Sequence, residues 1–311
     1  MTDQEAASST YALRHLHRTI DRLVEDALIN CIIGSRVRSR QIFSLYQPSQ
    51  TVALDCGCAT GTNLKTLLSR GCISVGLDLD ANLLEKAKSR VPDALFVVGD
   101  AVHTPFREET FDFVLCSDVL EHIPEDGKAL NEIHRILSED GIFALTVPID
   151  VERHWVWEIR ELFGLDKSFW MRFYYHVREG YQLESLTSLL SQTGFSTEKN
   201  AFCYGIFSNF IESLVIGILR KSMKNPSQIR SFNIGNAHKL LLVVYRIVFP
   251  FFLAFAYLDF LVPDRYLKSD VVIISRKQYP EEPIHNRRSH NIPPILFREN
   301  RLVESEHEHL P

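Results

Sequence analysis

The stretch that decides the fold is "DCGCATGTN", residues 55–63, which combines two cysteines with two glycines. It has two incompatible interpretations. Cys56 and Cys58 suggest a metal or redox centre, whereas Gly57 and Gly61 suggest a loop whose backbone approaches a ligand closely. The sequence on either side of the stretch decides between them.

The cysteine pattern does not favour a metal or redox centre. Zinc sites usually contain two Cys or His pairs, and the pair Cys56 and Cys58 has no second pair at a useful spacing. The C-x-x-C redox motif is absent. The six cysteines are scattered, mostly in apolar runs, as in reduced cytosolic proteins. We therefore expect buried thiols and no metal ion.

The glycines stand between a strand pattern and a helix pattern. "TVALD" (51–55) is a short β-branched apolar run, and "TNLKTLLSR" (62–70) has leucines at helical spacing. "CISVGLD" (72–78) is a second strand pattern, ending in Asp78, and "ANLLEKAKSR" (81–90) a second helix. Alternating strands and helices predict a parallel sheet with right-handed crossovers. A ligand would bind at the carboxyl ends of its strands.

The glycine spacing distinguishes two kinds of cofactor. A dinucleotide fingerprint needs glycines at 59 and 62, where the chain has Ala59 and Thr62. The pattern D/E-x-G-x-G-x-G fits Asp55, Gly57 and Gly61 with Ala59 as the one substitution. Here the sequence resembles the class I S-adenosylmethionine-dependent methyltransferases, whose first motif this is. The substitution matters only if that position takes a positive φ.

Later segments extend the resemblance, and they are similar to the small-molecule and ubiquinone-pathway subgroup. Strand patterns follow at 94–101 and 111–116, and then come "SDVLEHI", an amphipathic helix and a fifth strand. The likeness is good over 51–148 and weaker to about residue 204. It implies an α/β, Rossmann-like fold: a seven-stranded, mostly parallel sheet with helices on both faces and an antiparallel last strand at 270–277.

The resemblance implies S-adenosyl-L-methionine as the cofactor. Asp78 would accept hydrogen bonds from the ribose hydroxyls, and Asp100 would bind the adenine amine. Ser117 would face the reacting methyl group together with Asp118. An aspartate at a strand end is also a common turn or cap residue, so each acid has a structural alternative. The full set of expected cofactor-binding residues is Asp55, Gly57, Ala59, Gly61, Asp78, Leu79, Asp100, Ala101 and Ser117.

Methyl transfer depends mainly on alignment of the reactants, and a base is needed only if the acceptor must lose a proton. The candidate catalytic residues are His122 in "LEHI", His176 in "YYHVREGY", and Asp118. The structural alternative for His122 is packing at the start of a helix. For His176 a structural and a functional role are equally compatible with the sequence.

Two regions bear on the acceptor. Residues 152–181 are rich in aromatic side chains, which suits a flat or apolar acceptor and equally a core. The apolar segments 202–219 and 240–262 lie before the last strand, joined by the cationic "RKSMKNPSQIR" (220–230). Although the second segment is long enough to cross a bilayer, the last strand must return to the sheet. Two crossings would put the cations on the far side. We expect a helical hairpin in the cytoplasmic membrane interface, with a buried subdomain or homodimer interface as the alternative.

The expected organisation has five parts: a helical cap (1–50), a methyltransferase core (51–204), a hydrophobic helical insertion (205–265), the final strand (266–278) and a disordered tail (279–311). Arg36, Arg38 and Arg40 are expected on a solvated face, with contact to phosphate or lipid as the alternative. The net charge of −5 and the lack of a basic block give no sign of nucleic-acid binding. No signal peptide is visible, so we expect a cytoplasmic, peripheral or monotopic membrane protein.

Three functions follow as hypotheses. The first is a methyltransferase in lipid or quinone biosynthesis, acting on a hydrophobic or lipid-linked acceptor at a membrane surface. The second is a methyltransferase of a soluble small molecule, with the insertion as a dimer interface. The third is a membrane-bound scaffold that keeps the fold without catalysis. A nicotinamide-dependent oxidoreductase is disfavoured because the third glycine is missing.

Overall fold

A computed structural model describes residues 33–149, 154–222, 236–262 and 267–278. Within these residues seven strands form one sheet in the order β3-β2-β1-β4-β5-β7-β6. The strands are β1 Val52–Cys56, β2 Ile73–Asp78, β3 Leu95–Val98, β4 Phe111–Ser117, β5 Leu137–Pro148, β6 Phe195–Gly205 and β7 Lys268–Lys277. Strands β1 to β5 pair in parallel, and β7 runs antiparallel to β5 and β6. The predicted fold class is confirmed.

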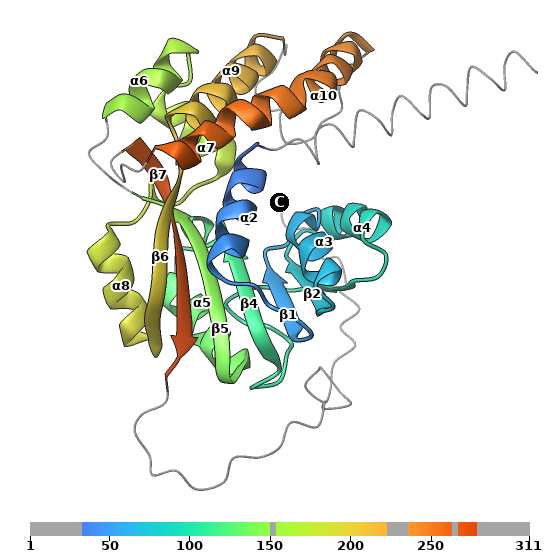
Figure 1. The fold of residues 1–311 in the computed structure, drawn as a ribbon, viewed down its shortest axis with the longest axis vertical. Coiled ribbons are helices and arrows are strands. Elements are labelled where there is room, and N and C mark those ends of the chain that lie inside the picture. Colours follow the sequence, from blue (N-terminus) through green and yellow to red (C-terminus); the bar gives the residue numbers. More distant parts are fainter. Residues whose placement is uncertain (1–32, 150–153, 223–235, 263–266, 279–311) are drawn as a thin grey trace, which may run out of the picture.

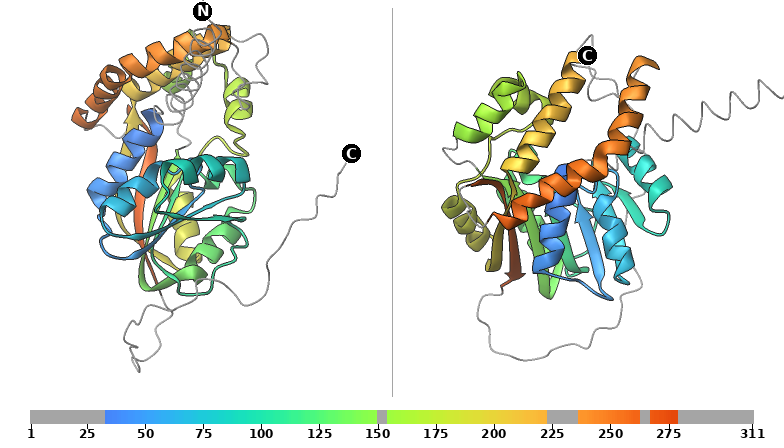
Figure 2. Two further views of the ribbon diagram at one scale, coloured as in Figure 1. Left: turned by 90° about the vertical axis from the view of Figure 1, so that its right-hand side faces the viewer. Right: turned by 45° about the horizontal axis from the view of Figure 1, so that its top comes forward.

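Helices cover both faces of the sheet (Figure 2). On one face, α2, α3 and α4 bury residues such as Val37, Leu64 and Leu84 in one apolar cluster. On the other face, α5 and α8 bury residues such as Leu130 and Leu186 in a second. The helices here are α2 Ile33–Leu45, α3 Thr62–Ser69, α4 Ala81–Arg90, α5 Asp126–Ile136 and α8 Leu183–Gln192. The central strands β1 and β4 are buried on both faces and are largely apolar, as parallel strands require, whereas the edge strands β3 and β6 carry exposed residues.

A group of helices lies over the carboxyl ends of the parallel strands (Figure 1). These are α6 His154–Leu162, α7 Lys167–Tyr174, α9 Ile206–Ser222 and α10 Asn236–Ala256, followed by the 3₁₀ helix η3 Tyr257–Leu261. Phe169 and Trp170 from α7 pack with Ile216 of α9 in a third buried cluster. Much of the aromatic run therefore serves as the core of this helical layer, which was the structural alternative.

The apolar segment 202–219 is divided between the sheet and a helix. Residues up to Gly205 belong to β6, because their backbone pairs with β7, as Phe202 does with Val271. The helix starts at Ile206. In the part of the chain that the structure describes, no helix combines the length and the apolar character that a bilayer crossing demands. Residues 1–32 of the predicted helical cap, most of the cationic connector and the tail lie outside the described residues.

Candidate functional site

The glycine-rich loop joins β1 to α3 and takes the left-handed backbone conformation three times. Gly57 has a φ of 76°, Ala59 of 45° and Gly61 of 78°. A Cβ on Gly57 would lie 2.3 Å from a methyl carbon of Val119, so glycine is required there for space as well. The substitution of alanine for glycine at position 59 therefore matters, because Ala59 takes a positive φ. An alanine in this conformation costs about 1–2 kcal/mol, which the surrounding hydrogen bonds must offset.

Cys58 does not behave as a reactive thiol. It is buried in this loop, and burial, with the charges of Asp55 and Asp78, raises the pKa of its thiol. A thiol that stays protonated is a poor metal ligand and a poor nucleophile. The expectation of buried thiols agrees with this environment, and Cys56 is buried as well.

Asp78, at the end of β2, holds the loop. One carboxylate oxygen accepts the backbone N–H of Ala59 at 2.8 Å, and the other accepts that of Asp80 at 3.0 Å. A carboxylate has about four acceptor positions, so each oxygen can accept one more hydrogen bond. Asp78 can thus anchor the loop and bind hydroxyl groups at the same time.

Asp55 is a buried carboxyl group that the fold leaves half satisfied. It is 1% exposed, and its Oδ2 has no hydrogen-bond partner among the described residues. Burial raises the pKa of Asp55 to about 7, opposed by a hydrogen bond from Asn63 and assisted by the charge of Asp78. A buried carboxylate oxygen without a donor is costly. This orphaned oxygen is suited to a ligand that carries N–H groups and positive charge.

The remaining predicted cofactor residues lie at the carboxyl ends of neighbouring strands. Asp100, after β3, is exposed, and its Oδ1 accepts the N–H of Val102 at 3.0 Å. Ser117, ending β4, hydrogen-bonds through Oγ to the hydroxyl of Thr146 at 2.8 Å. Leu79 is 72% exposed after β2, and Ala101 is half-buried. Because β3, β2, β1 and β4 are consecutive in the sheet, these residues line one edge.

Asp118 belongs to an ion-pair network that the sequence did not reveal. The Arg38 Nε of α2 lies 3.0 Å from Asp118 Oδ1 and 2.5 Å from Asp270 Oδ2 of β7. The guanidinium also stacks over the Tyr204 ring, with its carbon 4.5 Å from the ring centroid. Burial raises the pKa of Asp118 to about 7, although Arg38 opposes the shift. The prediction that Arg38 lies on a solvated face is wrong, because Arg38 bridges the two carboxylates.

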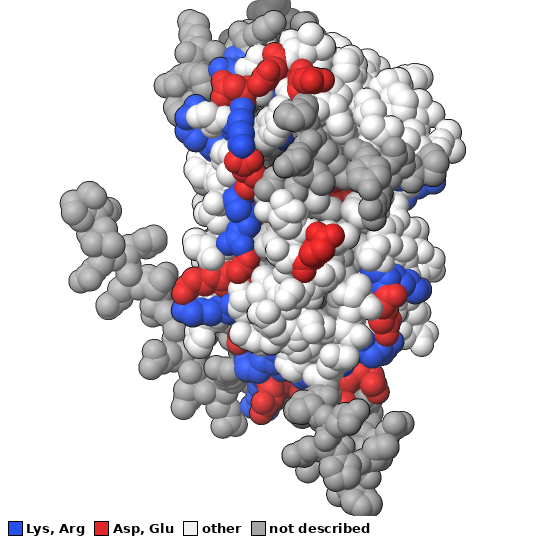
Figure 3. Space-filling model, turned by 90° about the vertical axis from the view of Figure 1, so that its left-hand side faces the viewer, with Lys and Arg blue, Asp and Glu red and all other residues white. Residues whose placement is uncertain are grey.

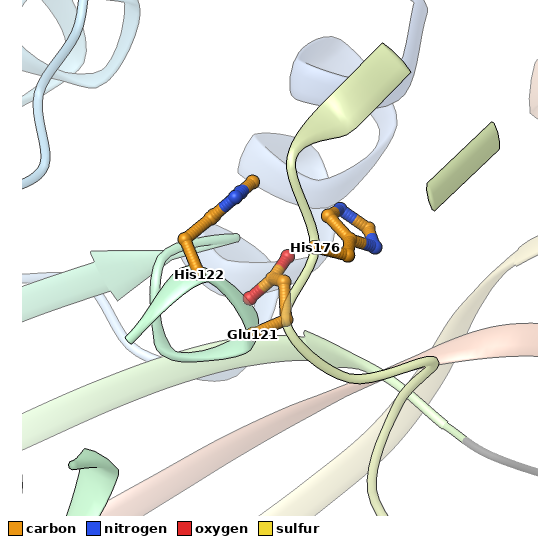
Figure 4. Close-up of side chains that lie close together, drawn as sticks. All are labelled: Glu121, His122 and His176. Atoms are coloured by element: carbon orange, nitrogen blue, oxygen red, sulfur yellow. The ribbon is translucent and has the colours of Figure 1, made fainter. Parts of the chain in front are cut away.

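His122 and His176 come together, with Glu121 beside them (Figure 4). His122 belongs to the 3₁₀ helix η1, Leu120–His122, and His176 follows α7. Their ring centroids are 4.8 Å apart, with the planes nearly perpendicular. Burial, together with His122, lowers the pKa of His176 to about 3, so His176 is neutral near pH 7. Burial and the charge of Asp118 raise the pKa of Glu121. Sequence reasoning missed Glu121, although "LEHI" places it next to His122.

Comparison with known proteins identifies the family of this chain. The family described as "Methyltransferase domain" matches residues 54–145. An uncharacterized methyltransferase of Synechocystis is 36% identical over 153 residues, which are 48% of this chain and 68% of that protein. The chain belongs to the class I S-adenosylmethionine-dependent methyltransferases. Its cofactor is S-adenosylmethionine.

Other relatives of this methyltransferase include quinone-pathway enzymes. The demethylmenaquinone methyltransferase of Renibacterium salmoninarum is 37% identical over 94 residues, 30% of this chain and 39% of that enzyme. That of Thermotoga maritima is 23% identical over 223 residues, 65% of this chain and 97% of the enzyme. The chain covers only about two fifths of the length of some curated relatives.

Solved structures show the same fold at low sequence identity. A chain of the complex between the Haloferax volcanii Trm112 methyltransferase activator and a methyltransferase has a TM-score of 0.52 at 13% identity, covering 85% of this chain and 97% of that one. Phosphoethanolamine N-methyltransferase 2 of Haemonchus contortus, in complex with S-adenosyl-L-methionine, has a TM-score of 0.50 at 20% identity. That match covers 78% of this chain and 52% of that one.

The residues of this methyltransferase fit its cofactor. S-adenosylmethionine carries an ammonium and a sulfonium charge, hydroxyl donors on the ribose and an exocyclic amine. The loop from Asp55 to Gly61 offers the unsatisfied Oδ2 of Asp55 and backbone without side-chain bulk at Gly57. Asp78 has acceptor positions left for hydroxyl groups.

Replacing Asp55 with asparagine is expected to stabilise the cofactor-free protein by about 2 kcal/mol at pH 8 and by little at pH 4. The folded-state pKa of about 7 lies above the ordinary 3.8, so the stability associated with this group is full below pH 4 and is lost as the pH rises through 7. Asparagine does not ionise, so the variant does not lose this stability as the pH rises. Urea unfolding at both pH values measures the effect, and the exposed Asp93, changed to asparagine, is the control. An equal gain at both pH values would contradict the prediction.

Proposed function

We propose that the protein transfers a methyl group from S-adenosylmethionine to a hydrophobic or lipid-linked acceptor at a membrane surface. The observation that carries the membrane part is an apolar stripe along α10 and η3. The stripe consists of exposed apolar side chains that recur every three or four residues, so they share one helix face. Ile247 is 66% and Phe251 74% exposed. The stripe contains Val244, Ile247, Phe251, Phe255 and Leu258.

A face that contacts a membrane is expected to carry few charged side chains. Figure 3, which views the left-hand side of Figure 1, shows an uncharged area at the upper right, whereas acidic and basic side chains form a band from the top of the view to its lower end. A contiguous apolar area on a soluble fold marks an interaction surface. An amphipathic helix that lies in the headgroup region buries such a face without crossing the bilayer.

A basic groove adjoins the end of the stripe. It has a volume of about 390 Å³ and lies between α2, α3 and η3, where Arg36, Arg40 and Arg70 line it together with Tyr257. None of the described residues that line it is acidic. The Arg40 guanidinium carbon stacks 4.5 Å from the Tyr257 ring centroid, which ties the groove to η3. Cations beside an exposed apolar face are the pattern expected at an anionic lipid surface.

In this proposal the cofactor lies along the loop from Asp55 to Gly61. Asp78 accepts hydrogen bonds from the ribose hydroxyls, and Asp100, with the backbone of Ala101, binds the adenine. Ser117 and Asp118 face the reacting methyl group. The cofactor supplies an activated methyl group, so the protein's own task is alignment and exclusion of water.

If the methyl acceptor must lose a proton, the candidate bases are His176 and Asp118. His122 lies beside His176. The low pKa of His176 keeps it neutral but makes it a weak base, whereas Asp118, whose pKa burial raises to about 7, is better matched to accept a proton near neutral pH. The acceptor class is supported by relatives named demethylmenaquinone methyltransferase. A quinone-like acceptor with an apolar tail would reach the site from the membrane side, below the helical layer that carries the stripe.

Vesicle flotation of the full chain tests the membrane part. We expect the protein to float with vesicles that contain phosphatidylglycerol and less with pure phosphatidylcholine. The double change Ile247→Glu and Phe251→Glu should abolish flotation, whereas Ile73→Glu, an exposed apolar residue at the opposite end of the sheet, should not. A wild type that stays unbound as a stable dimer would favour a soluble acceptor with the stripe as dimer interface.

A further inference from the structure

We propose that Glu121, His122 and His176 bind a divalent transition-metal cation. One ligand atom from each residue lies within 4.8 Å of the other two. Figure 4 shows the carboxylate between the two imidazoles, two ligands from η1 and the third from the segment after α7. Two imidazoles and one carboxylate are a frequent ligand set for Zn²⁺, Fe²⁺ and Mn²⁺ sites with open coordination positions.

The three ligand atoms are spaced somewhat more widely than they would be around a bound cation. Bonds of about 2.1 Å in a tetrahedral site place ligand atoms roughly 3.4 Å apart, so the three side chains must turn inward by about an ångström. The backbone that carries the ligands is already fixed.

Hydrogen bonds join the two segments that supply the ligands. The backbone N–H of Val177, next to His176, donates to the carbonyl oxygen of Glu121 at 2.9 Å. Arg178 donates to the carbonyl oxygen of Ile123 at 2.7 Å, and the Tyr181 hydroxyl donates to Asp126 at 2.9 Å. The ligands are therefore held at a short separation although they lie more than fifty residues apart in the chain.

His122 is oriented for ligation. Its Nδ1 lies 3.3 Å from the carbonyl oxygen of Tyr175, a residue with a φ of 56° that ends α7. With the Nδ1 proton donated to that carbonyl, Nε2 carries the lone pair that a metal requires. A second hydrogen bond of this kind accompanies most metal-ligating histidines.

The carboxylate gives an independent indication. Glu121 is 1% exposed, and its Oε2 has no hydrogen-bond partner among the described residues. The nearby Asp118 is also acidic, and the Arg38 guanidinium is already shared between Asp118 and Asp270. A buried carboxylate oxygen left without a partner is costly, and a cation would compensate it.

The proposed metal site also limits which chemical classes of methyl acceptor are expected, an inference that rests on the proposed function. Asp118 and Glu121 follow the same strand, β4, so the cation would lie on the side of the acceptor. Three protein ligands leave positions that oxygen donors can fill. We therefore expect an acceptor that bears a phenol or enol oxygen.

Metal binding is measured on the tag-free full chain. We expect about one equivalent of Mn²⁺ or Zn²⁺ in calorimetric titration with the metal alone, and at least a 30-fold weaker affinity in Glu121→Gln and His176→Ala. His103→Ala, which removes an exposed histidine elsewhere, should keep the wild-type affinity. Catechol, as a probe, should bind the metal-loaded chain and not the chain treated with EDTA.

If a variant folds poorly, measurements on the wild type alone still test metal binding. Saturating Mn²⁺ or Zn²⁺ should raise Tm by about 5 °C or more. An unchanged Tm together with no calorimetric binding overturns the metal site, and metal binding without catechol binding overturns the acceptor assignment. S-adenosylmethionine titrated in the presence of EDTA tests the cofactor site separately, so failure of the metal site and failure of the proposed function give different results.

Discussion

Replacing Arg38 with methionine is expected to lower the free energy of unfolding by about 3–5 kcal/mol at pH 7. The change leaves Asp118 and Asp270 facing each other without the cation that lies 3.0 Å and 2.5 Å from them. Asp270 is 2% exposed, so water cannot replace the guanidinium. Urea unfolding of the full chain measures the difference.

The pH dependence distinguishes lost charge pairing from lost packing. Without Arg38, the folded-state pKa of Asp118 should rise further above its unfolded value, because the guanidinium that opposes the shift is gone, so protonation of Asp118 relieves the penalty as the pH falls. The deficit should therefore shrink between pH 7 and pH 5. Arg36→Met, an exposed position on the same helix, is the matched control and should change stability little. A deficit that is the same at both pH values would indicate lost packing alone.

Replacing Asp78 with alanine is expected to weaken S-adenosylmethionine binding at least 100-fold. The change removes the acceptor of the Ala59 N–H as well as the proposed acceptor for the ribose hydroxyls. Charge-assisted hydrogen bonds contribute about 1.5–3 kcal/mol each, and 100-fold corresponds to about 2.7 kcal/mol. Calorimetric titration measures the affinity, with NADH as a control ligand.

Asp80→Ala is the matched control for this change. The Asp80 carboxylate caps α4 through the N–H of Asn82 at 2.9 Å, so its loss should lower stability by about 1 kcal/mol. Its effect on cofactor affinity should stay within about threefold. Equal losses of affinity in the two variants would mean that Asp78 acts through the loop and strand end in general. No loss in Asp78→Ala would remove Asp78 from the cofactor site.

The sequence determined the core of the fold and the edge that carries the cofactor loop. Apolar runs and helical spacings are local signals, and their alternation from residue 51 onward implies parallel strands whose carboxyl ends meet. Gly57 and Gly61 are needed at their own positions, and Asp78 and Asp100 follow their strands directly. Each of these features can be inferred within a window of about ten residues.

Only the tertiary structure decided which distant residues meet. Arg38 and Asp270 are 232 residues apart, and no local pattern distinguishes Arg38 from the exposed Arg36. The cluster proposed to bind a cation could not be found from the sequence, because Glu121 and His176 meet only through the packing of α7 over the strand ends. In α10 the apolar residues lie all around the helix, so periodicity could not tell the buried face from the exposed one. Such contacts depend on how helices and strands pack, and packing brings together residues whose local sequence patterns do not predict the contact.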